Sequence, residues 1–131
     1  MSEVIYLAGP FSHSDKNVME FRADALAWFA GTLMNMGHIV YSPVNYGDRI
    51  VMLHDLPTSW EYWKKMSVTS MSVCTKLCVI QLPGWEKSTG VQDEIKIADA
   101  LGIPVESINC ETITTLEEVT SLVNMKDLIC D

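Results

Sequence analysis

Basic residues are scarce in this chain and never gather into a cluster. Nine lysines and arginines stand against seventeen aspartates and glutamates among 131 residues, which gives a net charge of −8. A protein that binds polymeric nucleic acid needs a basic patch to neutralise phosphates. We therefore expect no DNA or RNA partner, although a small anionic metabolite needs only a local positive field.

Long apolar runs and metal-binding cysteine motifs are also missing. No apolar segment approaches the roughly 20 residues that cross a bilayer, so no membrane association is expected. The four cysteines follow no metal-ligand spacing, and we interpret them as buried thiols in a protein without a metal or other cofactor. The start of the sequence lacks the features of a signal peptide. Together these absences predict a cytoplasmic protein, which for a virus-encoded chain means the host cytoplasm.

Three common catalytic or nucleotide-binding motifs are absent from the sequence. It contains no phosphate-binding loop of the Gly-x-x-x-x-Gly-Lys type, and no Gly-x-Gly-x-x-Gly fingerprint follows the first predicted strand. Ser88 lacks the flanking glycines of a serine nucleophile elbow. The sequence thus argues against a P-loop nucleotidase, a dinucleotide-dependent enzyme and a serine hydrolase.

Hydrophobic residues make up 48% of the chain, which is enough for one globular domain spanning residues 1–131. Apolar periodicity predicts strands at 4–8, 39–41, 77–82 and 105–108, and helices at about 17–36, 58–73, 89–101 and 116–125. Residues 44–57 have no clear period and are interpreted as a long functional or mobile loop. This alternation predicts an α/β fold, a Rossmann-like (flavodoxin-like) three-layer sandwich with a mainly parallel sheet of four to five strands.

Ligands of such folds bind beyond the carboxyl ends of the strands. The loops after residues 8, 42 and 82 should therefore share one rim. The first of these loops supplies five candidate binding residues, which are Gly9, Pro10, Phe11, Ser12 and His13.

The turn after residue 82 combines a helix cap with a carboxylate. With Ser88 as N-cap, the backbone N–H groups of the next three residues and the positive end of the helix dipole favour an anion such as phosphate. Glu94 then lies within side-chain reach of whatever carries that anion. In the alternative interpretation Ser88 is only a cap, and Asp93 and Glu94 are acidic because such residues suit a first turn.

Two segments resemble the nucleoside 2-deoxyribosyltransferase superfamily, namely Tyr6-Leu7-Ala8-Gly9-Pro10 and Gly84-Trp85 followed by Ser88, Gly90, Glu94 and Ala98. The similarity extends over nearly the whole chain. It is strongest toward small uncharacterised bacterial and phage proteins, and the 2′-deoxynucleoside 5′-phosphate N-hydrolases share the same turn.

This resemblance implies cleavage or transfer of the N-glycosidic bond of a (deoxy)nucleoside or its 5′-monophosphate. Glu94 would attack the anomeric carbon and form a glycosyl-enzyme ester that water or another base resolves, as in a retaining glycosidase. Tyr6 would orient Glu94 through a hydrogen bond. Ser88, the backbone around Gly90, and Ser12 would bind the 5′-phosphate.

One departure from the family pattern concerns a helper aspartate in the helix before the third strand. This chain has Ser67 or Val68 where that Asp is expected. The substrate can differ, a substitute such as Asp93, Asp48 or Asp55 can act instead, or catalysis is lost. The alternative function is accordingly a non-catalytic protein that binds or sequesters a nucleotide.

Most of the remaining candidates carry two interpretations. His13 can contact a phosphate or simply be solvated, and Arg22 can pair with a phosphate or form a surface salt bridge. Trp85 is placed as an apolar wall over a sugar or base. Three further aromatic residues either stack on a base or fill a core or dimer interface, namely Trp60, Tyr62 and Trp63.

We expect a homodimer or higher homo-oligomer, with the apolar helix at 58–73 as a possible interface. The sequence leaves open which base is used, whether the sugar is ribose or deoxyribose, whether a 5′-phosphate is required, and whether water or a second base accepts the sugar.

Overall fold

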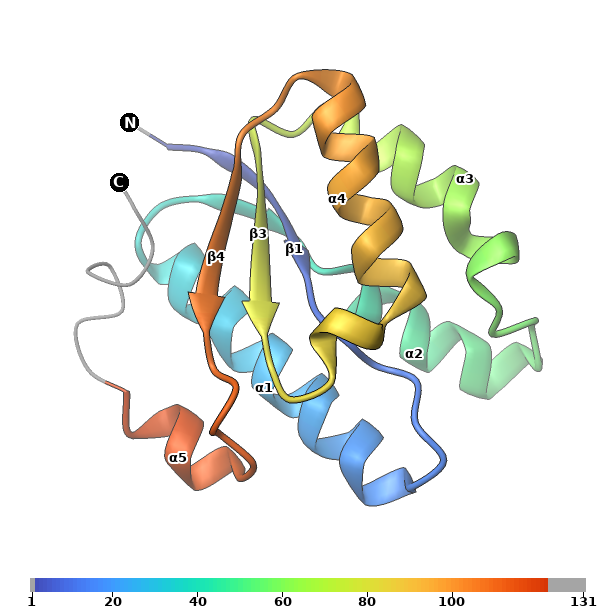
Figure 1. Ribbon diagram of the computed structural model, residues 1–131, viewed down its shortest axis with the longest axis vertical. Helices are drawn as coiled ribbons and strands as arrows, with labels where there is room; N and C mark the ends of the chain where they lie inside the picture. Colours follow the sequence, from blue (N-terminus) through green and yellow to red (C-terminus); the bar gives the residue numbers. More distant parts are fainter. Residues whose placement is uncertain (1, 123–131) are drawn as a thin grey trace.

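Strand β1 (Val4–Ala8) lies inside a parallel sheet whose strand order is β2-β1-β3-β4 (Figure 1). The computed structural model describes residues 2–122, and in that part of the chain β2 (Ile39–Tyr41), β3 (Lys76–Gln81) and β4 (Val105–Asn109) complete the sheet. Every neighbouring pair is parallel. The predicted α/β class and Rossmann-like sandwich with a parallel sheet are confirmed.

The two central strands are buried on both faces, which explains their almost wholly apolar sequences. On one face, alternate residues such as Ile5 and Ile80 pack against helix α1 (Lys16–Asn35) and the short helix α5 (Leu116–Thr120). On the other face, Val79 and its neighbours pack against the helix that precedes β3 in the chain and the helix that follows it. The sheet is therefore the middle layer of three.

The opposite face is covered by helices α3 (Trp60–Met71) and α4 (Thr89–Leu101), as Figure 1 shows. A 3₁₀ turn, η1 (Trp85–Lys87), links β3 to α4. From β1 the chain crosses to β2 on one side and later to β3 on the other. The order in which successive strands are added to the sheet thus reverses between β1 and β3, and folds of this class bind their ligands at such a point.

The segment 44–57, which we predicted to be a loop, is mostly helical. Helix α2 spans Pro43–His54, and the proline at its first turn supplies a pre-formed helical φ. Its apolar residues are divided between the interior and solvent: Val44 packs against the core, whereas Met52 and Leu53 are 68% and 66% exposed. Because residues 50–53 are a continuous apolar run that faces partly inward and partly to solvent, the helical period of this stretch is hard to read from the sequence.

The C-terminal helix begins as predicted, with Thr115 and Glu118 forming a capping box. It ends at Thr120, and the last residues of the predicted helix, 123–125, lie outside the described residues. Three of the four cysteines are free and buried, as expected, and Cys130 also lies outside the described range. Between residues 2 and 122, no helix has the length and apolarity that a membrane span requires.

Candidate active site

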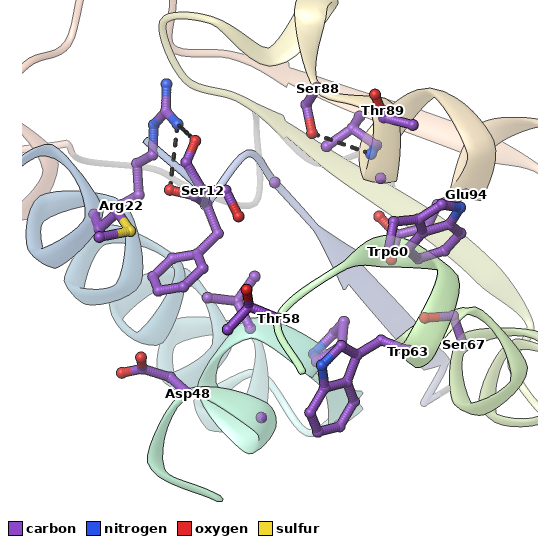
Figure 2. A pocket seen from close by; sticks show the side chains of 18 of the residues that line it. Ser12, Arg22, Asp48, Thr58, Trp60, Trp63, Ser67, Ser88, Thr89 and Glu94 are labelled. Carbon is purple, nitrogen blue, oxygen red and sulfur yellow. Dashed lines mark hydrogen bonds between the residues drawn. The ribbon is translucent and has the colours of Figure 1, made fainter. Parts of the chain in front are cut away.

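A pocket of about 960 Å³ opens beyond the carboxyl ends of β1 and β3. Its walls come from the loop after β1, from α2 and α3, and from the first turns of α4 (Figure 2). Its volume lies at the upper end of the range of about 300 to 1,000 Å³ that is typical of small-molecule sites. The three rim segments singled out in the sequence therefore meet at one cavity.

Glu94 lies in the wall of this pocket and is hydrogen-bonded to Tyr6. The Tyr6 hydroxyl donates to Glu94 Oε2, and the same hydroxyl lies 2.8 Å from Ser67 Oγ on α3. All three residues are buried, Glu94 being 6% exposed. Because a phenol has one proton and Tyr6 gives it to Glu94, the Ser67 hydroxyl is the donor in the second bond. The chain Ser67–Tyr6–Glu94 fixes the orientation of the carboxylate.

Burial changes the acidity of both ionisable members of this chain. It raises the pKa of Glu94 to about 7; the hydrogen bond from Tyr6 opposes this rise and the charge of Asp93 adds to it. The pKa of Tyr6 is raised far above its ordinary value, first by burial and then by the charge of Glu94, so the phenol stays neutral. A carboxyl group with a pKa near neutrality, facing a cavity, is typical of a catalytic acid or base.

The first turn of α4 provides an anion-binding end to the pocket. Ser88 caps the helix as predicted, with its Oγ accepting the Val91 N–H at 3.2 Å. The Thr89 and Gly90 N–H groups have no hydrogen-bond partner within residues 2–122, and both residues line the pocket. These two free donors at the positive end of the helix dipole favour a negatively charged group.

Arg22 is part of the pocket and does not form a surface salt bridge. The residue is 7% exposed. Its guanidinium donates to the carbonyl oxygens of Phe11 (3.3 Å), Ser12 (3.0 Å) and Pro83 (2.9 Å). In the described part of the chain it pairs with no carboxylate. Burial lowers the pKa of Arg22, as expected for a cation without a counterion.

The position of Arg22 in α1 contained a signal that sequence reasoning missed. It precedes the fully buried Ala25 and Leu26 by three and four residues and so lies on the face of α1 that packs on the sheet. Gly84 makes room for the guanidinium: it has φ +93°, and a Cβ there would lie 2.7 Å from Arg22 Nη2. Arg22 thereby joins the loop after β1 to the loop after β3.

Most residues predicted to bind the substrate do line the pocket. These are Gly9, Phe11, Ser12, His13, Ser88 and Gly90, together with the predicted nucleophile Glu94. The Nδ1 atom of His13 accepts the Asp15 N–H at 2.9 Å. In this structure His13 therefore reaches the pocket while part of its hydrogen-bonding capacity is used within the loop.

Four predicted site residues lie outside the pocket lining: Tyr6, Pro10, Trp85 and Asp93. Tyr6 is fully buried and is linked to the pocket by its hydrogen bond to Glu94. Pro10 is buried within the loop after β1. The Trp85 indole N–H donates to Glu111 Oε2 at 3.1 Å and its ring packs against the core, because the 3₁₀ turn directs it toward the end of β4. Asp93 accepts a hydrogen bond from Trp60 and does not face the cavity.

The aromatic residues of α3 were predicted either to stack on a base or to fill a core or dimer interface, and they differ in their positions. Trp60 and Trp63 line the pocket, whereas Tyr62 is 37% exposed on the outside. The Trp63 indole N–H donates to the Pro57 carbonyl at 2.8 Å, and its ring packs against Gly47 of α2. The pocket is therefore flanked by two indoles, one beside α4 and one beside α2.

The possible substitutes for the helper aspartate lie in different places. Asp48 lines the pocket, but on the far side from Glu94 in Figure 2. Asp55 is exposed at the left-handed C-cap of α2, with φ 52°. Ser67 takes the position beside Tyr6. Among residues 2–122 no group of three or more His, Cys, Asp or Glu side chains could hold a metal ion.

Comparison of the sequence with known proteins assigns this chain to a family. No curated protein matches the sequence of this chain. Residues 3–109 match a family described as a domain of unknown function, DUF1937. The matched segment includes all four strands and every residue that lines the pocket. Because the match covers most of its length, the chain belongs to the DUF1937 family.

Proposed function

We propose that this protein cleaves or transfers the N-glycosidic bond of a (deoxy)nucleoside or its 5′-monophosphate, with Glu94 as the nucleophile. The observation that carries the proposal is the buried Glu94 carboxylate, held by Tyr6 in the wall of a nucleotide-sized cavity. Tyr6 occupies only Oε2. Oε1 has no hydrogen bond within residues 2–122 and is not among the fully buried polar atoms, so it remains available to a ligand.

The reaction proceeds in two displacements. Glu94 Oε1 bonds to the anomeric carbon, and the base leaves with the electron pair of the C1′–N bond and takes a proton from water. A water molecule or a second base then attacks the same carbon, restores the carboxylate and, in the case of water, releases its proton to solvent. The ionised form of Glu94 is the nucleophile, and the positive charge that develops on the sugar favours that form.

The charges around the pocket favour a phosphate-bearing substrate. Arg22 contributes a buried positive charge without a carboxylate partner in the described residues, and the start of α4 contributes free N–H groups and its dipole. An anion bound between these elements would offset the cost of burying the guanidinium. A nucleoside 5′-monophosphate places such an anion on the sugar, several bonds from the carbon that Glu94 attacks.

The experiment compares wild-type protein with Glu94→Gln on a panel of nucleosides and 5′-monophosphates, with products separated by chromatography. We expect the wild type to release free base and Glu94→Gln to release none. Glu86→Gln is the matched control, because Glu86 is an exposed carboxylate of the adjoining turn and does not line the pocket. Base release by Glu94→Gln at the wild-type rate would exclude Glu94 as the nucleophile.

The second candidate is a non-catalytic protein that binds or sequesters a nucleotide. The second carboxylate of the pocket, Asp48, lies across the cavity from Glu94. This position does not suit the role of the missing helper aspartate, and this favours the second candidate. It predicts nucleotide binding in calorimetry together with intact nucleotide after hours of incubation. Detectable base release would exclude it.

We also propose that the protein acts in the cytoplasm as a homodimer or higher homo-oligomer. The apolar side chains exposed on and after α3, such as Val68 (37%) and Val73 (73%), support self-association. Light scattering of the purified protein measures its mass, and a monomer at micromolar concentration would contradict this part of the proposal.

A further inference from the structure

A hydrogen bond between Trp60 and Asp93 joins the beginning of α3 to α4. The indole N–H of Trp60 donates to Asp93 Oδ2 at 2.6 Å. The acceptor is a carboxylate, which makes this bond stronger than one between neutral groups. The only other polar contact of the Asp93 carboxylate within residues 2–122 is Lys96 Nζ, 4.0 Å away and largely exposed.

The Trp60 ring covers the part of α4 from which Glu94 projects. Gly90 and Glu94 are four residues apart and share one face of the helix. A Cβ at Gly90 would lie 3.7 Å from Trp60 Cε3, and the other edge of the indole reaches Asp93. Trp60 and Glu94 both line the pocket, and Figure 2 shows the indole at the same end of the cavity as the carboxylate.

Asp93 itself does not line the cavity. A ligand in the pocket therefore meets Trp60 and not Asp93. Without an acceptor for its N–H, the half-buried indole would be free to change rotamer, which would move its flat surface away from Glu94. Any effect of Asp93 on a bound ligand passes through the orientation of Trp60.

We propose that Trp60 is the surface on which the planar base of the nucleotide stacks, and that Asp93 is a positioning residue that holds this indole in place. The inference rests on the proposed function and specifies how its substrate is recognised. Aromatic stacking accepts every base because each has a flat π-face. The site then requires a planar heterocycle at C1′, and the Trp60 indole discriminates only weakly among the bases.

A double-mutant cycle tests the role assigned to Asp93. Trp60→Phe keeps a ring but loses the N–H, Asp93→Ala loses the acceptor, and Asp93→Asn keeps an acceptor oxygen. We expect Trp60→Phe and Asp93→Ala to raise KM by similar factors with little change in kcat, and the double variant to be no worse than either. Asp93→Asn should retain most of the wild-type kcat/KM. If Asp93→Asn lowers kcat as much as Asp93→Ala, and does so also in the Trp60→Phe background, Asp93 touches the reacting atoms and the proposal is overturned.

Nucleotide binding to the Glu94→Gln variant tests the stacking surface independently of turnover. We expect Trp60→Leu in this background to weaken the Kd measured by calorimetry by roughly 5- to 150-fold, the range found when a stacking aromatic is removed. Tyr62→Leu is the matched control, because it removes an aromatic ring from the same turn of α3 outside the pocket.

The two proposals fail in different ways. Nucleotide binding that depends on Trp60, without base release by the wild type, would exclude the proposed reaction and support the stacking surface. Base release by the wild type, with equal Kd values for the Trp60→Leu and Tyr62→Leu variants, would overturn the stacking surface alone. Circular dichroism confirms that each variant is folded before it is compared.

Discussion

The Tyr6 hydroxyl of β1 donates a hydrogen bond to Glu94 of α4, and this contact joins the central strand to the helix that carries the carboxylate. The two residues are 88 positions apart in the sequence. Because Tyr6 is fully buried and also bonded to Ser67, its hydroxyl has one stable orientation. Glu94 is therefore held in position before any ligand enters, which lowers the cost of reaching a reactive geometry.

Replacement of Tyr6 by Phe should shift the pH dependence of activity to higher pH. The Tyr6 hydrogen bond stabilises the ionised carboxylate and holds the pKa of Glu94 below the value that burial alone would produce. Without it the pKa rises above about 7, and the ionised nucleophile is present only at more alkaline pH. Base release measured from pH 5 to 9 tests this, and an acid limb at the wild-type position would contradict it.

Replacement of Glu94 by Gln should stabilise the protein at high pH. Because its pKa is raised from 4.5 to about 7 on folding, the folded state binds the Glu94 proton more tightly than the unfolded state. The resulting stabilisation is complete below pH 4.5 and is lost as the pH rises through 7. A pKa shift of this size corresponds to a loss of about 3 kcal/mol in the free energy of unfolding of the wild type at high pH. The Glu94→Gln variant escapes this loss because glutamine never ionises.

Urea unfolding at pH 4.5 and pH 8 measures this difference. Glu94→Gln should exceed the wild type in free energy of unfolding at pH 8 and be close to it at pH 4.5. The exposed Glu86→Gln variant provides the control and should follow the wild type at both pH values. A pH-independent difference would mean that Glu94 does not titrate in this range.

Replacement of Gly84 by Ala should destabilise the protein more than replacement of Gly37. Both glycines have positive φ, +93° and +95°, so each alanine carries a similar backbone strain of about 1 kcal/mol. A Cβ at Gly37 meets nothing within 4 Å, whereas one at Gly84 lies 2.7 Å from Arg22 Nη2. Denaturant unfolding of the two variants isolates the cost of displacing Arg22, and equal losses would show that the guanidinium moves freely.

Replacement of Arg22 by Met should reduce the preference for 5′-monophosphates over nucleosides. Methionine fills much of the same space without the charge, so the phosphate loses a nearby cation. Arg22→Lys keeps the charge but cannot hold the three carbonyl oxygens in the same way, and should preserve more of the preference. The ratio of the two kcat/KM values measures this, and a ratio unchanged in Arg22→Met would remove Arg22 from phosphate binding.

The order of strands and helices was predictable from the sequence because most elements have a clear apolar period. Val4–Ala8 and Lys76–Gln81 are strands near the predicted places, and Ser88 caps α4 where a capping side chain was expected. Each of these features depends on residues close together in the sequence, namely an apolar run for a strand and a capping side chain for the start of a helix. The exception was α2, where the continuous apolar run at residues 50–53 faces partly inward and partly to solvent and obscures the helical period.

The composition of the pocket was harder to predict because it depends on how separate helices pack. The sequence placed Glu94 beside Tyr6 only through the family resemblance, and the structure contains that hydrogen bond. Whether Trp60 belongs to a core or to a cavity depends on the packing of α3 against α4, which no local pattern records. The direction of Trp85 likewise depends on the 3₁₀ turn that carries it toward Glu111.

Helices α2 and α3 follow one another directly in the chain, between β2 and β3, whereas Tyr6 and Glu94 come from segments on either side of them. One uninterrupted stretch of sequence therefore supplies the walls of the cavity that come from α2 and α3, and within it only Ser67 is hydrogen-bonded to the phenol. Exchange of this stretch among members of the family would alter which molecules fit, while the carboxyl–phenol pair kept its place. Ligand specificity can therefore diverge through substitutions confined to the segment that carries α2 and α3.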